Sequence, residues 1–377
     1  MFSSILRSLP ALERRWKPLS FTNPNFTLPH YVPSQFYPTQ IGEVIKERYQ
    51  VVGKLGFGST STVWLARDME DRRYVILKIF IQASSMGHQV DNELNMYKIM
   101  EQSSSTHPGR KVIRKLLDTF DIDGPQDQHR CLVHPPLWES VLAYLRRNPV
   151  ERLPSPVLAV VLHRLFLALD YLHTECHIAH TDIKADNIMF VINDNSVFTD
   201  FEESELRNPV PRKQVATAAD GDGTSRTIYM SQELKIPKSP HSVFAQAKIY
   251  RAPEVLLGVP WTFSADIWNV GCMIWDIYEG GSFCAHLAEM INLLGPPPSS
   301  LLSRGELRDK FFSGEGNFLH PEFLTDLVPL EQRETTLQGK EERQAFLRFM
   351  NRMLQWEPEK RSSAIELAGD EWLHSHM

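Results

Sequence analysis

The sequence predicts an α+β protein, with a smaller β-rich part up to about residue 135 and a larger helical part after it. Two observations predict this division. Short runs of apolar and β-branched residues, separated by turn residues, dominate the first part. After Pro154, apolar residues recur at intervals of three and four, which is the period of an α-helix. A chain of 377 residues with 42% apolar residues can bury a core of this size.

The first strands and the first helix follow from local patterns. Apolar runs predict strands, and turn residues between them predict hairpins. An apolar stripe at helical spacing then predicts an amphipathic helix. The expected strands are 49–58, 61–68, 73–80 and 130–134, and the expected helix is 90–100.

The second part is expected to be mostly helical. Leucines at 158, 162, 165, 169 and 172 form one apolar stripe, which predicts a long core helix. A more uniformly apolar segment predicts a central helix. The further expected helices are 265–280, 285–295, 344–356 and 363–373.

Charge and cysteine content exclude several classes of protein. The net charge is −6, so we expect no direct nucleic-acid binding and no membrane association. No apolar run approaches the length that crosses a bilayer. The four cysteines form no C-x-x-C pair, which argues against a zinc site and for reduced thiols inside a cell. We therefore expect an intracellular protein, in the cytoplasm and/or the nucleus.

Residues 1–40 are rich in Pro, Ser, Thr and Asn and predict an extended leader, partly packed on the domain. Within the first 17 residues, four basic residues accompany a single acid, Glu13. This composition is typical of a mitochondrial presequence, which we retain as a minor alternative. Pro10 interrupts any helix there, and a disordered tail is the more ordinary explanation of the segment.

A glycine-containing turn links the first two long strands. Glycines allow backbone N–H groups to approach phosphate oxygens closely, and the kinase form of this loop is G-x-G-x-x-G-x-V. Here Ser61 replaces the third Gly, and the motif by itself is weak. The candidate nucleotide-binding residues in this hairpin are Leu55, Gly56, Phe57, Gly58, Ser59 and Val63.

Lys78 lies late in the third strand, in "VILK", where kinases place the Lys that binds the α- and β-phosphates. A strand-end Lys can also simply reach solvent. Glu93, central in the helix 90–100, is the natural partner for an ion pair with Lys78.

The segment "HTDIKADN" (180–187) fits H-x-D-x-K-x-x-N, and this match carries the prediction. Asp182 would orient or accept the proton of a substrate hydroxyl, and Lys184 would neutralise the γ-phosphate. Asn187 would offer an amide oxygen to Mg²⁺. We expect ATP and Mg²⁺ as cofactors.

Three downstream features occur in the order that a kinase requires. "YRAPE" (250–254) closes an activation segment, and Asp266 in "DIW" is expected to bind the backbone of the catalytic loop. Arg361 is expected to pair with Glu254. Each feature is common alone, so their order and separation carry the information.

On these motifs the chain resembles eukaryotic protein kinases over residues 45–375, and most closely the SR-protein-specific kinases of a divergent fungal branch. The segments behind this are "LGFGSTSTVWLARD", "YLHTECHIAHTDIKADNI" and "APEVLLGVPWTFSADIWNVGCMIW". The resemblance implies a bilobal fold, with a β-rich N-lobe (41–135) and a helical C-lobe (136–377). It also implies the use of MgATP to phosphorylate Ser or Thr, often in Arg/Ser-rich proteins. We expect the chain to act as a monomer. The family's docking groove would lie near 280–290, where the chain looks shortened, so the Arg/Ser preference stays open.

Thr181 replaces the Arg that gathers an activation-loop phosphate in most kinases. Without that counter-charge, activity is expected not to depend on activation-loop phosphorylation.

The metal-binding D-F-G motif is the place where the pattern breaks. One interpretation uses Asp200 of "VFTDFEE" as the metal ligand, with "SVF" as the strand that delivers it. Glu202 then stands where Gly belongs, and Gly tolerates backbone angles that Glu does not. The second interpretation, which we favour, treats this segment as a polar insertion. A strand, the metal-binding Asp and most of the activation segment would then be missing before "YRAPE".

These interpretations leave three functions. The first is an active Ser/Thr protein kinase, and the second is a catalytically impaired pseudokinase or truncated isoform that serves as a binding or scaffold module. The third, a small-molecule kinase, is weaker because "YRAPE" and "DIW" build a platform for peptide substrates.

Overall fold

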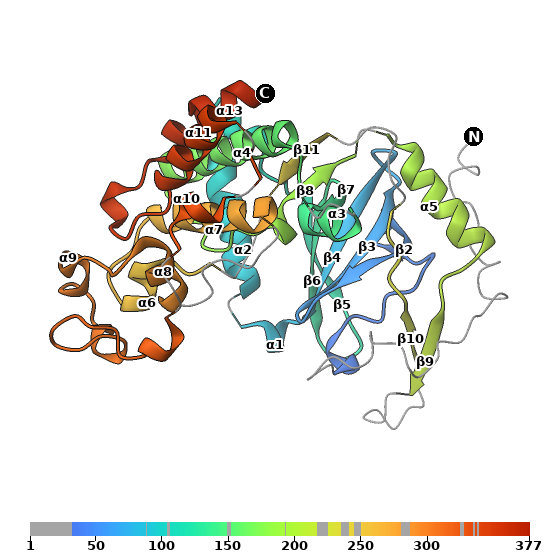
Figure 1. Ribbon diagram of the computed structural model, residues 1–377. Helices are drawn as coiled ribbons and strands as arrows, with labels where there is room; N and C mark the ends of the chain where they lie inside the picture. The colour runs from blue at the N-terminus through green and yellow to red at the C-terminus, as the bar shows by residue number, and fades with distance from the viewer. Residues whose placement is uncertain are drawn as a thin grey trace. The chain divides into compact units, whose positions relative to one another are not determined.

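The computed structural model (Figure 1) describes the chain from residue 32 onward in most of its length. The described ranges are 32–87, 89–103, 106–148, 152–192, 194–216, 225–234, 241–244, 250–279, 287–324, 328–334, 336–337 and 339–377. The expected targeting segment in the first 17 residues lies outside them. The chain divides into two compact units: residues 1–99, 114–138 and 191–241 form unit 1, and the remaining residues form unit 2.

Unit 1 is built on an antiparallel six-stranded sheet of order β1-β2-β3-β4-β6-β5. Alternating β-branched and aromatic residues bury one face, where Val51, Trp64, Leu77 and Val133 share a core. The strands are β1 (Val44–Ile45), β2 (Tyr49–Phe57), β3 (Ser61–Asp68), β4 (Arg73–Gln82), β5 (Asp118–Asp123) and β6 (Gln128–His134). The four strands expected in this part are confirmed.

Two helices follow the sheet's central strand, α1 (Ala83–Met86) and α2 (Gln89–Gln102). Val90 and Leu94 of α2 pack in a second core with Phe36. The leader is therefore partly packed on the domain, as expected. Arg226 fastens it further by donating to the carbonyl oxygens of Pro33 and Phe36.

The segment 191–241 groups with unit 1, although the linear division at residue 136 places it with the helical part. It contains helix α5 (Ser196–Arg207) and the hairpin β9 (Arg212–Ala216) and β10 (Ser225–Tyr229). Figure 1 shows α5 and this hairpin, both in yellow-green, along the β2 side of the sheet. The segment groups with unit 1 because α5 packs on strands β2, β3 and β4 in the folded protein.

Unit 2 is helical and centres on α4 (Ser155–Asp170), whose apolar stripe is buried as expected. Trp372 packs on Phe349 with the two rings 5.5 Å apart. The helices are α3 (Val141–Arg147), α4, α6 (Pro253–Leu257), α7 (Ser264–Glu279), α8 (Leu287–Leu294), α9 (Ser299–Leu302), α10 (Leu330–Arg333), α11 (Lys340–Asn351), α12 (Ala364–Ala368) and α13 (Glu371–His376). A three-stranded sheet has the order β11-β8-β7, with β7 (Leu137–Ser140), β8 (Met189–Val191) and β11 (His241–Phe244).

Three sequence expectations about these elements were wrong. The single helix expected over 363–373 is two helices, because Asp370 caps a new one through its bond from Trp372 N. The strand expected in "SVF" is the first turn of α5. The strand expected to be missing before "YRAPE" is present as β11, although residues 245–249 lie outside the described ones.

One stretch, Ser155–Glu175, is long and apolar enough to cross a bilayer by length and composition, where no such run was expected. Within its most apolar window, 61% of the residues are buried inside the protein. A core helix has this property, so the match is weak evidence for a membrane span.

Candidate active site

The hairpin of β2 and β3 presents the glycine turn. The strands stay paired up to Phe57 and Thr62, and the amide of Gly58 donates to the carbonyl of Ser61 over 2.8 Å. A Cβ added to Gly56 or Gly58 would meet no atom within 4 Å. The protein itself does not fill the space beside these glycines, so the backbone there is open to a ligand.

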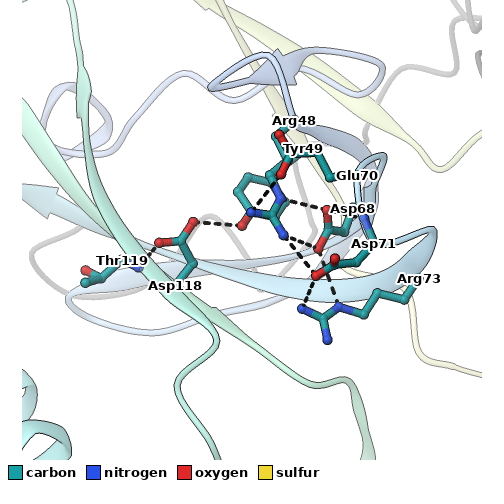
Figure 2. Close-up of polar contacts among 8 residues, drawn as sticks. All are labelled: Arg48, Tyr49, Asp68, Glu70, Asp71, Arg73, Asp118 and Thr119. Carbon is teal, nitrogen blue, oxygen red and sulfur yellow. Dashed lines mark hydrogen bonds and ion pairs between the residues drawn. The ribbon is translucent and has the colours of Figure 1, made fainter.

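The opposite end of the same hairpin is closed by a charge network (Figure 2). Arg48, just before β2, donates to both carboxylate oxygens of Asp68 at the end of β3, over 2.7 and 2.9 Å. Burial disfavours the charged form of Asp68, but the bonds from Arg48 and from the Asp71 amide outweigh it and lower its pKa. Tyr49 donates to Asp118 over 2.8 Å, which ties β2 to β5. These bonds fix the strands of the hairpin at the end opposite the glycine turn.

Lys78 and Glu93 form the ion pair that their positions predict. The Lys78 ammonium lies 2.9 Å from both carboxylate oxygens of Glu93. Lys78 is paired across the strands with Val63, so both side chains point to one face of the sheet. The pair is about one quarter exposed, which leaves the Lys78 ammonium reachable for an anionic ligand.

A further group of polar residues surrounds this pair, and sequence reasoning missed it. The Tyr97 ring lies 5.6 Å from that of His134. Burial, together with the charge of Glu93, raises the pKa of Tyr97 to about 12. Burial lowers the pKa of Arg114, while Glu93 and Tyr97 oppose that change. Arg114 lies outside every sequence motif considered above, so only the folded structure relates it to Tyr97 and Glu93.

The catalytic-loop candidates lie next to two buried anchors in unit 2. Ile183 and Ile188 are each 1% exposed, whereas Asp182, Lys184 and Asn187 are only partly buried. The amide of Asn187 donates to the carbonyl of Lys184 in a short turn, over 3.1 Å. The alternation of anchors and polar residues holds all three candidates in a single loop.

Asp266, at the start of α7, fixes the beginning of this loop. Its carboxylate accepts from the amides of His180 and Thr181 over 2.7 and 2.6 Å. The same carboxylate lies 2.9 Å from His173 Nε2. Thr181 has φ of 62°, a costly conformation for a β-branched residue, which these bonds help to hold. The expected contact between Asp266 and the loop backbone is confirmed.

The expected pair of Glu254 and Arg361 is also confirmed. Both guanidinium nitrogens of Arg361 lie 2.7 Å from the carboxylate oxygens of Glu254, and both side chains are fully buried. Arg361 donates also to the carbonyl of Ser264 at the start of α7. This bidentate pair links "YRAPE" to the helix that carries Asp266.

Asp200 does not lie at a strand end. It is an exposed residue of α5, within unit 1. The metal-ligand interpretation thus loses the strand on which it depended, and the structure favours the polar insertion. The neighbouring acids have other partners: Glu202 accepts from Arg67 and Tyr74, and Glu205 accepts from the amide of Val210.

Sequence reasoning missed that α5 docks on the sheet. The signal was present, because its buried residues fall at helical spacing. They are Val197, Phe198, Phe201, Glu202 and Glu205. Two glutamates in this stripe hid the pattern, since acids are rarely buried unless they are paired.

Within unit 1, the open backbone at Gly56 and Gly58 and the ammonium of Lys78 suit the phosphates of ATP. Within unit 2, Asn187 offers an amide oxygen of the kind that Mg²⁺ takes, which accounts for a magnesium site only in part. Across the described part of the chain, no three His, Cys, Asp or Glu side chains gather as metal ligands do.

Comparison with known proteins places this geometry in a family. The protein kinase domain family matches residues 49–373. A serine/threonine protein kinase of Aspergillus fumigatus is 36% identical over 92% of this chain and 89% of its own length. A serine/threonine-protein kinase named SRPK, from Physarum polycephalum, is 30% identical over 89% of this chain and 88% of its own length.

Two further matches are more distant or shorter. The SRSF protein kinase 3 of Mus musculus is 34% identical over half of this chain and 34% of its own length. A solved kinase domain shares the fold, with a TM-score of 0.66 at 21% identity, over 90% of this chain and 99% of that one. The N-terminal sheet, the helical remainder and these matches together establish that this chain belongs to the protein serine/threonine kinase family.

Proposed function

We propose that this chain transfers the γ-phosphate of ATP, in the presence of Mg²⁺, to Ser or Thr hydroxyls of protein substrates. The observation that carries the proposal is the loop 180–187, whose beginning is fixed by Asp266 and whose end forms a short turn from Lys184 to Asn187. Asp182 orients the substrate hydroxyl and takes its proton, and Lys184 neutralises charge on the transferred phosphate. Lys78, held by Glu93, positions the other phosphates.

Transfer of labelled phosphate from ATP to an Arg/Ser-repeat peptide tests the proposal. Asp182→Asn should lower transfer by at least ~10²-fold while nucleotide still binds. Asp186→Asn is the matched control, because Asp186 lies in the same loop but is exposed, and its carboxylate accepts a hydrogen bond from Ser140. Parent and control should keep their activity; equal loss in both variants would contradict the role of Asp182.

Lys78→Met separates binding from chemistry. The ammonium that meets the phosphates is lost, so the stabilisation of the protein by ATP should shrink or vanish. Thermal unfolding with and without MgATP measures it. An unchanged shift would show that Lys78 does not contact the nucleotide.

A nucleotide-binding pseudokinase is the second candidate. The position of Asp200 on a helix favours it, since this residue is not delivered to a metal by a strand. In that case MgATP raises the unfolding temperature, but no peptide is phosphorylated with either Mg²⁺ or Mn²⁺. A chain that turns over MgATP with peptide rules it out.

We further propose that the preferred substrates are Arg/Ser-rich proteins and that the chain acts as a monomer in the cytoplasm or nucleus. The names of the Physarum and mouse relatives, SRPK and SRSF protein kinase, support the substrate class. A comparison of Arg/Ser, Lys/Ser and Ala/Ser repeat peptides tests it, and equal rates on all three would contradict it.

A further inference from the structure

Helix α5 is seated on β2, the strand that leads into the glycine turn. The Phe201 ring fills the space beside Gly53, where an added Cβ would lie only 2.6 Å from Phe201 Cε1. Phe201 is 1% exposed. Gly53 therefore allows the close approach of a helix to a strand. The pairing of β2 with β3 also shifts register on both sides of this point.

Glu202 anchors the same helix to the next two strands. Its carboxylate accepts from the Arg67 guanidinium on β3 and, over 2.8 Å, from the Tyr74 hydroxyl on β4. Burial and the bond to Glu202 raise the pKa of Tyr74. Because Glu202 is 2% exposed, the loss of either partner would leave a buried carboxylate with incomplete compensation for its burial.

Strand pairing places these anchors on the face that carries Lys78. Val63, Leu65 and Arg67 alternate along β3, so they point to one face. Val63 pairs with Lys78, and Arg67 pairs with Tyr74. Gly53 pairs with Leu65. Helix α5 thus covers the same face of the sheet as Lys78, a few residues along each strand.

The hairpin that follows α5 holds the other face of β2. Lys54 pairs with Trp64, and the Trp64 ring meets that of Tyr229 edge to face at 5.8 Å. Lys54 Nζ donates to the Tyr229 carbonyl over 3.2 Å, and the amide of Gln232 donates to the Lys54 carbonyl over 2.9 Å. The Lys54 ammonium also lies 4.8 Å from the Phe57 ring of the glycine turn.

We propose that α5 and the β9–β10 hairpin form a brace that sets the position of the glycine turn for nucleotide binding. Phe201 and Tyr229 contact β2 on its two faces, at residues 53 and 54, a few residues before the turn at Gly58. Phe201 is then a positioning residue, acting through Gly53. This inference rests on the proposed nucleotide binding, but the brace itself can be measured without nucleotide.

A double-mutant cycle on Gly53 and Phe201 tests the brace. Gly53→Ala forces the ring away, so the hydrogen-bonded amides of residues 54–62 should exchange with solvent at least ~10-fold faster. Phe201→Leu removes Cε1 and Cζ, the two ring atoms nearest to the added methyl. The double variant Gly53→Ala/Phe201→Leu should therefore exchange more slowly than Gly53→Ala alone.

Tyr49→Phe is the control on the same strand. It removes the bond to Asp118 at the far end of β2, so it should lower stability without changing exchange in residues 54–62. Nucleotide affinity provides a second readout: Gly53→Ala should raise the Kd for MgATP by ~10-fold, and Tyr49→Phe should leave it unchanged.

The outcomes separate two failures. If Gly53→Ala destabilises the protein but leaves exchange in 54–62 at the parent rate, the brace is overturned. The same holds if Tyr49→Phe loosens the turn equally. If the parent binds no nucleotide but the exchange cycle behaves as expected, the proposed function fails and the brace stands.

Discussion

The energy of an ion pair in this kinase depends on how deeply the pair is buried. Glu254 and Arg361 are both fully buried and bidentate, whereas Arg304 and Glu359 form a pair of similar length at the surface. A buried charge that loses its partner keeps its desolvation penalty, and an exposed one recovers water. The two pairs should therefore respond very differently to the same substitution.

Arg361→Ala should lower the free energy of unfolding by about 3–5 kcal/mol, because Glu254 is left charged and buried. Arg304→Ala, the matched surface change, should cost at most ~1 kcal/mol. Urea unfolding of both variants measures the difference. Similar losses would mean that Glu254 finds another partner or becomes protonated at little cost.

Asp266→Asn tests the anchor of the catalytic loop. Asp266 holds two backbone amides and His173, so the neutral side chain should cost about 2–4 kcal/mol. The amides of His180 and Thr181 should exchange faster in the variant. Asp309→Asn changes a side chain that is 88% exposed, so it should neither lower the stability nor speed up the exchange of these two amides. Unchanged exchange at both loop amides would disprove the anchoring role.

At the scale of elements, α5 shows how a helix with five charged residues becomes part of a core. It buries one stripe on the sheet and pairs each of the two glutamates in that stripe. The second of these, Glu205, accepts from the Val210 amide and from Arg212, whose guanidinium lies 5.1 Å from the Tyr229 ring. Glu205 therefore connects α5 to the hairpin.

Glu205 should make the stability of unit 1 depend on pH. Burial raises its pKa from the usual 4.5 to about 7, against the opposing effects of the Val210 amide and Arg212. A raised pKa means that the folded state holds the proton more tightly. The associated stabilisation is full below pH 4.5 and is lost as the pH rises towards 7.

Relative to Glu205→Gln, which cannot ionise, the parent should lose up to about 3 kcal/mol between pH 4.5 and 7. Urea unfolding of both proteins across this range gives the difference between their free energies of unfolding at each pH. All other titrating groups contribute equally to the two proteins, so their effects cancel in this difference. A constant difference would show that Glu205 is ionised throughout and that Arg212 outweighs its burial.

At the scale of the whole molecule, kinase activity is expected to be independent of activation-loop phosphorylation. Thr181 stands where most kinases have Arg, and its amide is bound by Asp266. A neutral side chain offers a phosphate no counter-charge. Treatment of the purified chain with a protein phosphatase should therefore leave peptide phosphorylation unchanged. An obligatory phosphosite between residues 202 and 250 would refute this.

Local sequence patterns were sufficient to predict most of the strands of the sheet and the position of the catalytic loop. Strands β2 to β4, helix α2 and the long helix α4 were predictable because alternation and helical spacing act over few residues. The pairs of Lys78 with Glu93 and of Glu254 with Arg361 were predictable through their order in a known motif. Helix α5 was not, because "SVF" has strand propensity and only docking on the sheet decides its conformation.

The sequence by itself determined the family, the nucleotide-binding hairpin and the polar residues of the catalytic loop, since each lies within a short, ordered motif. The tertiary structure alone decided where the segment after that loop belongs. Asp200 could be interpreted as a metal ligand, or its segment as a polar insertion, until Arg67, Tyr74 and Gly53 were seen against α5. Arg67 and Tyr74 lie 135 and 128 residues from Glu202 in the chain, so only the packed fold brings them together.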